Sequence, residues 1–382
     1  MDPSCSDLDG VLALGRARAR LDTLQGLLVP HKGYPASHLP LPQQSLAAAA
    51  TAGDDDLSDP FSVASLQRAG AAAGFTAVTP AILAELKACV ADPAKQFTVT
   101  ESLLDTATFA QSPVARAVSD RSHFDALPCS VVVYPASTEE VSRLMRVCFR
   151  HRVAVNPAGT RTGLEGSSLS VVPGVVVNMS RMDRILKLSR EEMLIEVQPG
   201  IEKVMLNAQL KKEGLFFPVD PGSNACVGGY ANTGASGTLS YKYGTMRENC
   251  RQMTVVMSDG RVMVTRTRAP KSSVGYNLHQ LLIGSEGTLC IVTELILVVR
   301  PIPSAMLAAR VQFPSTRQVC DFVTALIAAG VTQLARAELL NALMMRGVNK
   351  YSKTDYPEAP TLFLEFHGTT AEVRASAENI RH

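Results

Sequence analysis

The sequence of 382 residues is long enough for two domains of ordinary size together with irregular extensions. Hydrophobic residues make up 46% of the chain, which excludes a disordered protein and allows a sizeable core. The 37 Lys and Arg residues are interspersed with 35 Asp and Glu residues, so no basic stripe indicates a nucleic-acid partner. No apolar run reaches the roughly 18 residues of a membrane-spanning helix, so we expect no transmembrane segment.

The eight cysteines are scattered and form no Cys-x-x-Cys pair, which predicts reduced, mostly buried thiols rather than a disulfide framework. The N-terminus combines two opposed signals. Three arginines between residues 16 and 20 lie among Ala and Leu, as in a mitochondrial transit helix, whereas three aspartates in the first nine residues are untypical of one. The expected location is the mitochondrion, with the cytoplasm as the alternative.

The first 125 residues divide into two segments. Residues 1–75 are expected to form an irregular or disordered extension, because the stretch 31–62 is rich in Pro, Ala, Ser and Asp and cannot assemble a core. Residues 76–125 are expected to lead into the first domain as a helical segment, with a helix near 80–91 that Pro80 opens.

Residues 126–303 alternate strand and helix patterns, as one folded domain would. Ser137 begins a helix, and Glu140 three residues later gives the capping-box pattern. A second helix ends at Gly214, a favoured C-cap residue, and the Asp-Gly pair at 259–260 predicts a tight hairpin turn. That second helix has its apolar residues between 204 and 210, and a further short helix is expected from Asn277. The predicted strands cover residues 130–134, 153–156, 175–179, 184–188, 193–198, 254–258, 261–265 and 288–299.

After Pro303 the order of predicted strands and helices changes, so residues 304–382 are expected to form a second domain. The predicted strands cover 305–313, 334–339 and 361–366, and the predicted helices cover 316–329, 341–347 and the last residues. This is the α+β patterning of a separate sheet domain with helices packed on one face. Because the chain stops at His382 inside a helix, we expect this domain to be incomplete.

Three Gly-rich loops are the candidate ligand-binding segments, at residues 157–164, 218–237 and 284–289. Small residues let backbone N–H groups approach a pyrophosphate closely, and the Thr and Ser hydroxyls add donors. None of the loops fits the dinucleotide pattern G-x-G-x-x-G or the P-loop pattern G-x-x-x-x-G-K-[ST]. One such loop alone is more often a plain turn. Three loops joined by strands favour a cradle for one long phosphate-bearing ligand.

The same segments resemble a known family. PAGTRTGLEG, GLFFPVDPGSNACVGGYANTGASGTLSYKYGTMREN and KSSVGYNLHQLLIGSEGTLCIVTE resemble the FAD-linked oxidases with a vanillyl-alcohol-oxidase (PCMH-type) flavin domain, over residues from about 120 to 382. Within that family they are most similar to cytochrome-linked D-lactate dehydrogenases and glycolate-oxidase subunits, and TLFLEFHG is similar to a strand of their cap domain. The resemblance implies an α+β fold, a two-subdomain PCMH-type FAD-binding domain followed by an incomplete α+β (ferredoxin-like) cap domain.

The resemblance also implies which residues would hold FAD. The first loop would wrap the pyrophosphate, the second would line the flavin and its phosphates, and the third would reach the adenine or ribose end. Because the first loop has no His or Cys for covalent attachment, and Cys226 alone is poor support, the implied FAD is non-covalent. The implied FAD-binding residues are Pro157, Ala158, Gly159, Thr160, Arg161, Thr162, Gly163, Asp220, Pro221, Gly222, Ser223, Asn224, Ala225, Cys226, Thr233, Gly234, Ala235, Ser236, Glu286, Gly287, Thr288, Leu289, Cys290, Ile291 and Val292.

The sequence departs from the family pattern in the flavin loop. Arg161 stands where the family has a glycine, and a left-handed backbone there would cost Arg about 1 kcal/mol or more. Its guanidinium could instead pair with the pyrophosphate, but we expect weaker FAD binding. The segment 119–122 also matches its family counterpart poorly.

The sequence offers fewer candidate residues for substrate binding and catalysis than for FAD binding. The His-rich cap motif of the family is missing, so a divalent metal is expected only if a further C-terminal part exists. The seven histidines show no metal-ligand spacing, and His367, after a buried strand, is expected to be structural. Arg336 is a candidate clamp for a substrate carboxylate, with a surface strand charge as the alternative, and no catalytic base is assigned.

The implied function is FAD-dependent oxidation of a D-2-hydroxy acid, D-lactate foremost, to the 2-oxo acid. Electrons would pass to a cytochrome or a quinone. Two alternatives stay open. The first is a truncated or degenerate paralogue that binds FAD without turnover, and the second is a flavoenzyme similar to alkylglycerone-phosphate synthase.

Overall fold

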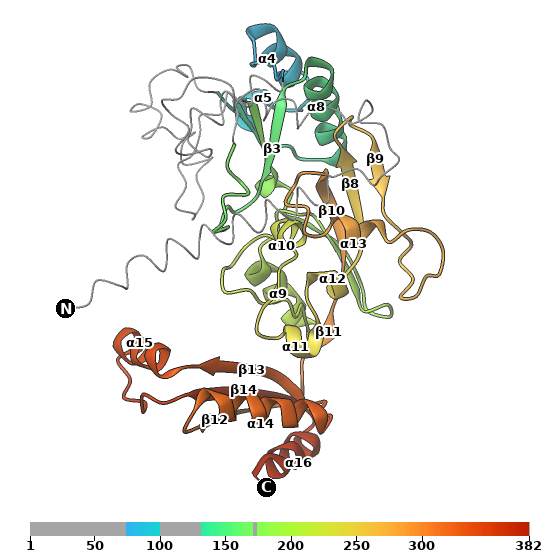
Figure 1. Ribbon diagram of the computed structural model, residues 1–382. Helices are drawn as coiled ribbons and strands as arrows, with labels where there is room; N and C mark the ends of the chain where they lie inside the picture. Colours follow the sequence, from blue (N-terminus) through green and yellow to red (C-terminus); the bar gives the residue numbers. More distant parts are fainter. Residues whose placement is uncertain (1–73, 100–130, 171–173, 382) are drawn as a thin grey trace, which may run out of the picture. The chain divides into compact units, whose positions relative to one another are not determined.

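The computed structural model describes residues 74–99, 131–170 and 174–381, shown in colour in Figure 1. The predictions of an extension, a transit helix and a poorly matching segment at 119–122 therefore lie outside the described residues, as do Cys5 and Cys129. The chain separates into a unit of residues 1–58 and a unit of residues 59–382. All described residues belong to the second unit.

The first sheet has four strands in the order β1-β2-β4-β3. Strands β2, β4 and β3 are parallel, and β1 pairs antiparallel with β2. The runs of Val that predicted β2 and β4 are fully buried, as central strands of a parallel sheet require. Strand β1 was not predicted, because three residues are too few to show an alternating pattern. The strands are β1 (Phe97–Val99), β2 (Val131–Val133), β3 (Ala154–Ala158) and β4 (Gly174–Asn178).

Helix α8 (Thr138–His151) packs against β3 of the first sheet and β8 and β10 of the second, and Figure 1 shows it beside β8. The prediction of its start is confirmed, since the Ser137 side chain accepts the Glu140 N–H. In a capping box the Glu side chain would also accept the N–H of Ser137, but Glu140 has other partners here. The Glu140 carboxylate accepts the N–H groups of Ala136 and Ala91 and the amide of Gln96, so it ties α8 to the segment before β1. That segment holds α4 (Pro80–Lys87) and α5 (Pro93–Gln96).

The second sheet is antiparallel, with five strands in the order β5-β6-β10-β8-β9. The predicted hairpin is confirmed: β8 pairs with β9, and Gly260 takes a φ of 82° in the turn. One face packs on α8 through Val256 and Ile291, and the other joins the largest core of the molecule through Val255 and Val292. The strands are β5 (Ile185–Ser189), β6 (Leu194–Val197), β8 (Cys250–Met257), β9 (Val262–Val264) and β10 (Cys290–Val298).

The largest core lies between the second sheet and short helices from the segments that join its strands. The predicted helix before Gly214 is confirmed as α9, and the one after Asn277 as α13. Three short helices between Val227 and Asn249 were not predicted, because the Gly pair in this loop lowers helix propensity and only packing overrides it. The elements are η2 (Met179–Arg181), α9 (Lys203–Lys212), β7 (Leu215–Phe216), α10 (Val227–Thr233), α11 (Ser240–Tyr243), α12 (Met246–Asn249), α13 (Leu278–Leu282) and β11 (Arg300–Pro301).

The last part of the chain forms a three-stranded antiparallel sheet in the order β12-β14-β13. Helices α14 and α16 pack on it through Val319, Leu326 and Val373, which join the buried Leu362, Leu364 and Phe366 in one core. The α+β prediction is therefore confirmed. The elements are β12 (Ala305–Gln312), α14 (Thr316–Ala328), β13 (Leu334–Leu340), α15 (Ala342–Ser352), β14 (Thr361–Gly368) and α16 (Thr370–Arg381).

Buried thiols are distributed through these cores. Six cysteines are described, all of them free, and five of the six are buried, with Cys320 the exposed one. Burial raises the pKa of Cys148 and of Cys250 to about 12. For the cysteines in the described ranges, the prediction of reduced and mostly buried thiols is confirmed.

Replacing Glu140 with Ala should destabilise the protein by about 2–4 kcal/mol, because three N–H donors would lose a buried acceptor. Equilibrium denaturation in urea measures the change. Glu139→Ala is the matched control, since Glu139 is exposed one residue away and its loss should cost less than about 1 kcal/mol. Equal effects of the two substitutions would contradict the role given to Glu140.

Candidate functional site

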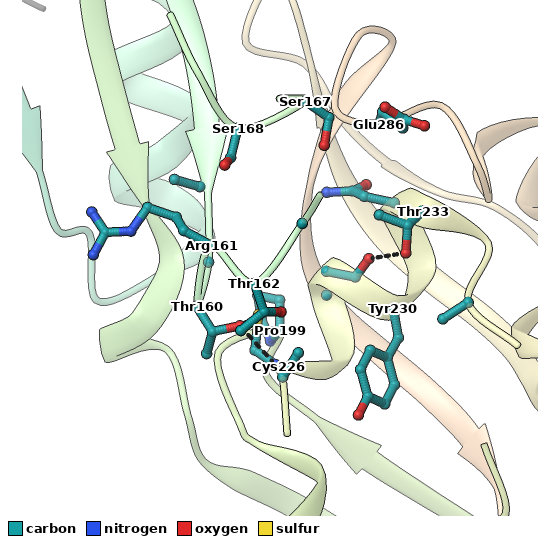
Figure 2. A pocket seen from close by; sticks show the side chains of 18 of the residues that line it. Thr160, Arg161, Thr162, Ser167, Ser168, Pro199, Cys226, Tyr230, Thr233 and Glu286 are labelled. Carbon is teal, nitrogen blue, oxygen red and sulfur yellow. Dashed lines mark hydrogen bonds between the residues drawn. The ribbon is translucent and has the colours of Figure 1, made fainter. Parts of the chain in front are cut away.

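A cavity of about 400 Å³ lies where the loop after β3 faces α10 and the start of β10. Figure 2 shows Thr160 and Thr162 on this loop, with Tyr230 and Thr233 across the cavity. Ser167 and Glu286 lie at one end of the view. The walls are therefore built from segments far apart in the sequence, which small residues allow to approach closely.

The loop after β3 offers backbone donors. Among the described residues, the amide N–H groups of Thr160, Arg161, Thr162 and Gly163 have no hydrogen-bond partner. Unpaired N–H groups that line a cavity form an anion-binding surface. The loop is held in place at one point, because the Thr160 hydroxyl accepts the N–H of Cys226 at 3.3 Å.

Two glycines let the walls close. A Cβ on Gly159 would lie far inside contact distance of Cys226 Sγ, and a Cβ on Gly228 would lie 2.5 Å from Pro199 Cβ. These contacts are the reason that both positions need glycine. The backbone conformation is not the reason, since neither glycine has a φ in the left-handed region. The glycines bring the loop after β3, the loop after β6 and helix α10 into contact.

Helix α10 contributes side chains rather than its N-terminal amides. The Val227 and Gly228 N–H groups are taken by the carbonyls of Ile201 and Pro199. In contrast, Asn232 Oδ1 is buried and has no partner in the described structure, and Asn232 lines the cavity. An orphaned buried acceptor in a cavity wall indicates a place that a ligand would satisfy.

Most of the residues that the sequence pointed to line this cavity. Those residues are Pro157, Ala158, Gly159, Thr160, Arg161, Thr162, Gly163, Pro221, Gly222, Ser223, Ala225, Cys226, Thr233, Ala235, Glu286, Ile291 and Val292. Five further lining residues lie inside the predicted loops but were not named one by one: Leu164, Gly228, Gly229, Tyr230 and Asn232. Sequence reasoning missed the lining residues Ser167, Ser168, Met179 and Pro199, and nothing local marks Met179 or Pro199.

Eight of the implied residues lie elsewhere. Four of them line a second cavity of about 990 Å³, which shares Pro157 and Ile291 with the first: Gly287, Thr288, Leu289 and Cys290. Gly234 caps α10 with a φ of 60°, Ser236 is exposed, and Asn224 accepts the Val204 N–H. Asp220 instead accepts the Thr238 hydroxyl and the Leu239 N–H, both at 2.9 Å.

Arg161 adopts the left-handed conformation, with a φ of 53°. The condition for backbone strain at this position is therefore met. Its Nε and Nη1 atoms are buried without a partner in the described chain, and burial lowers the pKa of the guanidinium. Figure 2 shows the side chain directed away from Thr233 and Tyr230.

Arg336 sits in a charged network between β13, β14 and the second Gly-rich loop. Its guanidinium lies 3.4 Å from Asp220 Oδ2 and 3.4 Å from Glu365 Oε1. The buried His367 contacts Glu365 through Nε2 and the Tyr243 hydroxyl through Nδ1, the latter at 2.8 Å. The Arg336 side chain is still 35% exposed, so an incoming carboxylate could reach it.

The cavity fits a dinucleotide better than a compact ligand. It combines a row of unpaired amides, hydroxyl side chains and an orphaned amide oxygen, and it shares the wall residues Pro157 and Ile291 with a second cavity. Two domain families match this part of the chain and the part after it. The description "FAD binding domain" matches residues 129–266, and "FAD linked oxidases, C-terminal domain" matches residues 302–382. The chain belongs to the FAD-linked oxidase family.

Relatives in this family include D-lactate dehydrogenases. The chain is 41% identical over 254 residues to a probable mitochondrial D-lactate dehydrogenase of Danio rerio, which covers 66% of this chain and 51% of that protein. It is 41% identical over 251 residues to the mitochondrial D-lactate dehydrogenase [cytochrome] of Arabidopsis thaliana, covering 66% and 44%. With the glycolate oxidase subunit GlcD of Bacillus subtilis the identity is 30%, covering 67% and 55%. The chain spans about half the length of these relatives.

Solved structures share the fold at lower identity. An alkyldihydroxyacetonephosphate synthase matches with a TM-score of 0.64 at 22% identity, covering 79% of this chain and 58% of that one. The berberine bridge enzyme of Eschscholzia californica matches with a TM-score of 0.59 at 16% identity, covering 78% and 57%. These likenesses support the α+β fold that the sequence predicted.

Two further features bear on the chemistry. In the ranges that the structure describes, no group of three or more His, Cys, Asp or Glu side chains could hold a metal ion. No helix in those ranges combines the length and the apolar character needed to cross a membrane.

Replacing Gly159 with Ala should lower the melting temperature and weaken FAD binding at least tenfold, because the new methyl group collides with Cys226 Sγ. Flavin fluorescence titration and thermal denaturation measure the two effects. The second substitution Cys226→Ala should restore much of both, since it removes the colliding atom. Gly229→Ala is the control for stability, because its Cβ would meet Cys226 Sγ at an acceptable 3.4 Å. Failure of the double variant to recover would contradict the packing role.

Proposed function

We propose that the chain binds FAD non-covalently in this cavity and oxidises a D-2-hydroxy acid, D-lactate foremost, to the 2-oxo acid. The observation that carries the proposal is the loop of unpaired amides at Thr160–Gly163, which lies inside the region matched by the FAD-binding domain family. The D-lactate dehydrogenases among the relatives support the choice of substrate.

Different parts of the cavity wall would hold different parts of the cofactor. The amides of Thr160–Gly163 would hold the pyrophosphate, since they form a row of free donors in the wall. Gly222 and Ser223 would line the flavin, and Asn232 Oδ1 offers a free acceptor in the same cavity. Residues Gly287–Ile291 would hold the adenine end. Non-covalent binding follows from the absence of a His in the first cavity wall and from the buried position of Cys226.

FAD supplies a hydride acceptor for the hydrogen on the carbon that carries the substrate hydroxyl. The chain supplies a cation, Arg336, whose planar guanidinium can bind the substrate carboxylate through two hydrogen bonds. Asp220 and Glu365 hold this cation from two sides at 3.4 Å, distances long enough for a substrate carboxylate to compete. His367 has both ring nitrogens engaged and serves to orient Glu365.

The electrons then pass to a cytochrome or a quinone, and the protein works in the mitochondrion. The names of the Danio rerio and Arabidopsis thaliana relatives support both points, since both are mitochondrial and the second carries the designation cytochrome.

The proposal predicts that purified protein saturated with FAD shows the oxidised flavin spectrum and loses it when D-lactate is added without oxygen. L-lactate is the control, and it should leave the spectrum unchanged. Persistent colour with D-lactate, glycolate and 2-hydroxyglutarate would favour the second candidate, an FAD-binding protein without turnover. The strained Arg161 is the observation that favours this second candidate.

Replacing Arg336 with Lys should raise the KM for D-lactate about tenfold or more, because an ammonium group cannot make two parallel hydrogen bonds to a carboxylate. Initial rates of D-lactate-dependent dye reduction give the KM. Arg310→Lys is the matched control, since Arg310 lies on the neighbouring strand pair and stacks on Tyr356. An unchanged KM in the Arg336 variant would remove this residue from the substrate site.

Replacing Arg161 with Gly should raise the free energy of unfolding by about 1 kcal/mol, because Gly holds the left-handed conformation that Arg161 adopts without its strain. Equilibrium denaturation in urea measures the change. Lys353→Gly relieves the same kind of strain at the end of α15 and should give a similar gain. Lower stability in the Arg161 variant would contradict strain at this position, and weaker FAD binding in a fluorescence titration would show that the guanidinium pairs with the pyrophosphate.

A further inference from the structure

Three arginines and one buried histidine gather at the open end of the β8–β9 hairpin, outside both cavities. They are Arg251, Arg266, Arg300 and His279, and we call them the arginine cluster. Burial, with the charges of Arg266 and Arg300, lowers the pKa of Arg251, and burial, with the charges of Arg266 and Arg251, lowers the pKa of His279, so the four groups lie close together. Arg251 is on β8, Arg266 follows β9, Arg300 is on β11, and His279 is on α13.

Hydrogen bonds bring two of the guanidiniums together. Arg251 Nη1 donates to the carbonyl of Pro270 at 3.0 Å, and Arg266 Nη2 donates to the carbonyl of Ala269 at 2.8 Å. Because these carbonyls belong to consecutive residues, the two guanidiniums meet at one turn of the loop after β9. Helix α13, which carries His279, packs on β8 (Figure 1).

The donors of the arginine cluster are incompletely used. The Nε atoms of Arg251, Arg266 and Arg300 and the Nδ1 atom of His279 are buried, and none has a hydrogen-bond partner in the part of the chain that the structure describes. His279 is only 2% exposed, whereas the three arginines are half-buried as whole residues, so an anion approaches them at guanidinium atoms other than the buried Nε.

The arginine cluster also lacks a counter-charge. No carboxylate within the described ranges pairs with any of its three guanidiniums, although Arg268, two residues after Arg266, pairs with both Glu192 and Glu196. Burial, together with Arg266 and Arg251, lowers the pKa of His279 to about 4, so this side chain is neutral at neutral pH. Arginine keeps its proton in proteins, so three positive charges repel one another in a half-buried place.

We propose that the arginine cluster binds a phosphate-type anion at a site separate from the FAD cavity. A phosphate oxygen pair matches the fork of a guanidinium, and an anion between Arg251 and Arg266 would cancel their repulsion. The N–H tautomer of His279 adds a donor without adding charge. A free phosphate and the phosphate of a lipid headgroup present the same chemistry to this site.

The test uses protein saturated with FAD, so that the cofactor occupies its own phosphate-binding loop. Inorganic phosphate should raise the melting temperature by about 3–6 °C over potassium chloride at equal ionic strength. Co-sedimentation with phosphatidylcholine vesicles that contain phosphatidate, against phosphatidylcholine alone, tests the lipid source. A response in either arm supports the proposal and identifies the source. No response in both arms overturns it.

Substitutions separate the arginine cluster from the rest of the surface. The double variant Arg251→Gln, Arg266→Gln should melt above the unsubstituted protein in chloride, because repulsion is relieved, and it should lose the phosphate response. Arg268→Gln is the matched control, since it breaks two ion pairs and should melt lower while keeping the response. If the double variant fails to fold, Arg300→Gln serves in its place and should weaken the response. A full response in the double variant, or in its substitute, overturns the proposal.

Discussion

The contact between the loop after β3 and Cys226 is the constraint on which the candidate site depends. Four amides of the loop have no partner in the described structure. In a free chain the same amides would find partners in the chain itself or in water, so the fold has to hold the loop in place. Gly159 allows the loop to lie against Cys226 Sγ, and the Thr160 hydroxyl accepts the Cys226 N–H. Because Cys226 directly precedes α10, this one contact joins the first sheet to the helix that forms the opposite wall.

Arginines in this molecule occur in two electrostatic situations. Arg336 and Arg268 are each held by two carboxylates, so their charges are balanced inside the fold. All of these arginines have a buried nitrogen atom without a hydrogen-bond partner among the described residues. What differs is the counter-charge, because no carboxylate in the described ranges forms an ion pair with Arg161 or with the arginine cluster. Since guanidinium groups stay charged, balance in the second situation has to come from outside the chain. We therefore expect external anions to bind at Arg161 and at the arginine cluster. At Arg336, a substrate carboxylate has to compete with Asp220 and Glu365 for the guanidinium.

Local patterns predicted the elements with strong signals and missed those that packing creates. The Val runs of β2 and β4, the Ser137 cap and the Asp-Gly turn carry their signals within a few residues. Helix α10 has no such signal, because Gly228 and Gly229 disfavour a helix. It forms because Gly228 fits against Pro199, 29 residues earlier in the chain, where any side chain would collide. Gly260 shows both effects, since its turn was predictable but its carbonyl also accepts the Ser142 hydroxyl of α8.

The sequence by itself determined the α+β class, the Gly-rich loops and the resemblance to FAD-linked oxidases, because spacing and residue type are local properties. Tertiary structure decided what those residues do in space. It placed Asp220 on the turn at Thr238 and beside Arg336, rather than in the cavity wall. It also gathered the arginine cluster from positions as far apart as Arg251 and Arg300. Charge balance and hydrogen-bond satisfaction depend on which groups meet across the fold, and a linear pattern does not contain that information.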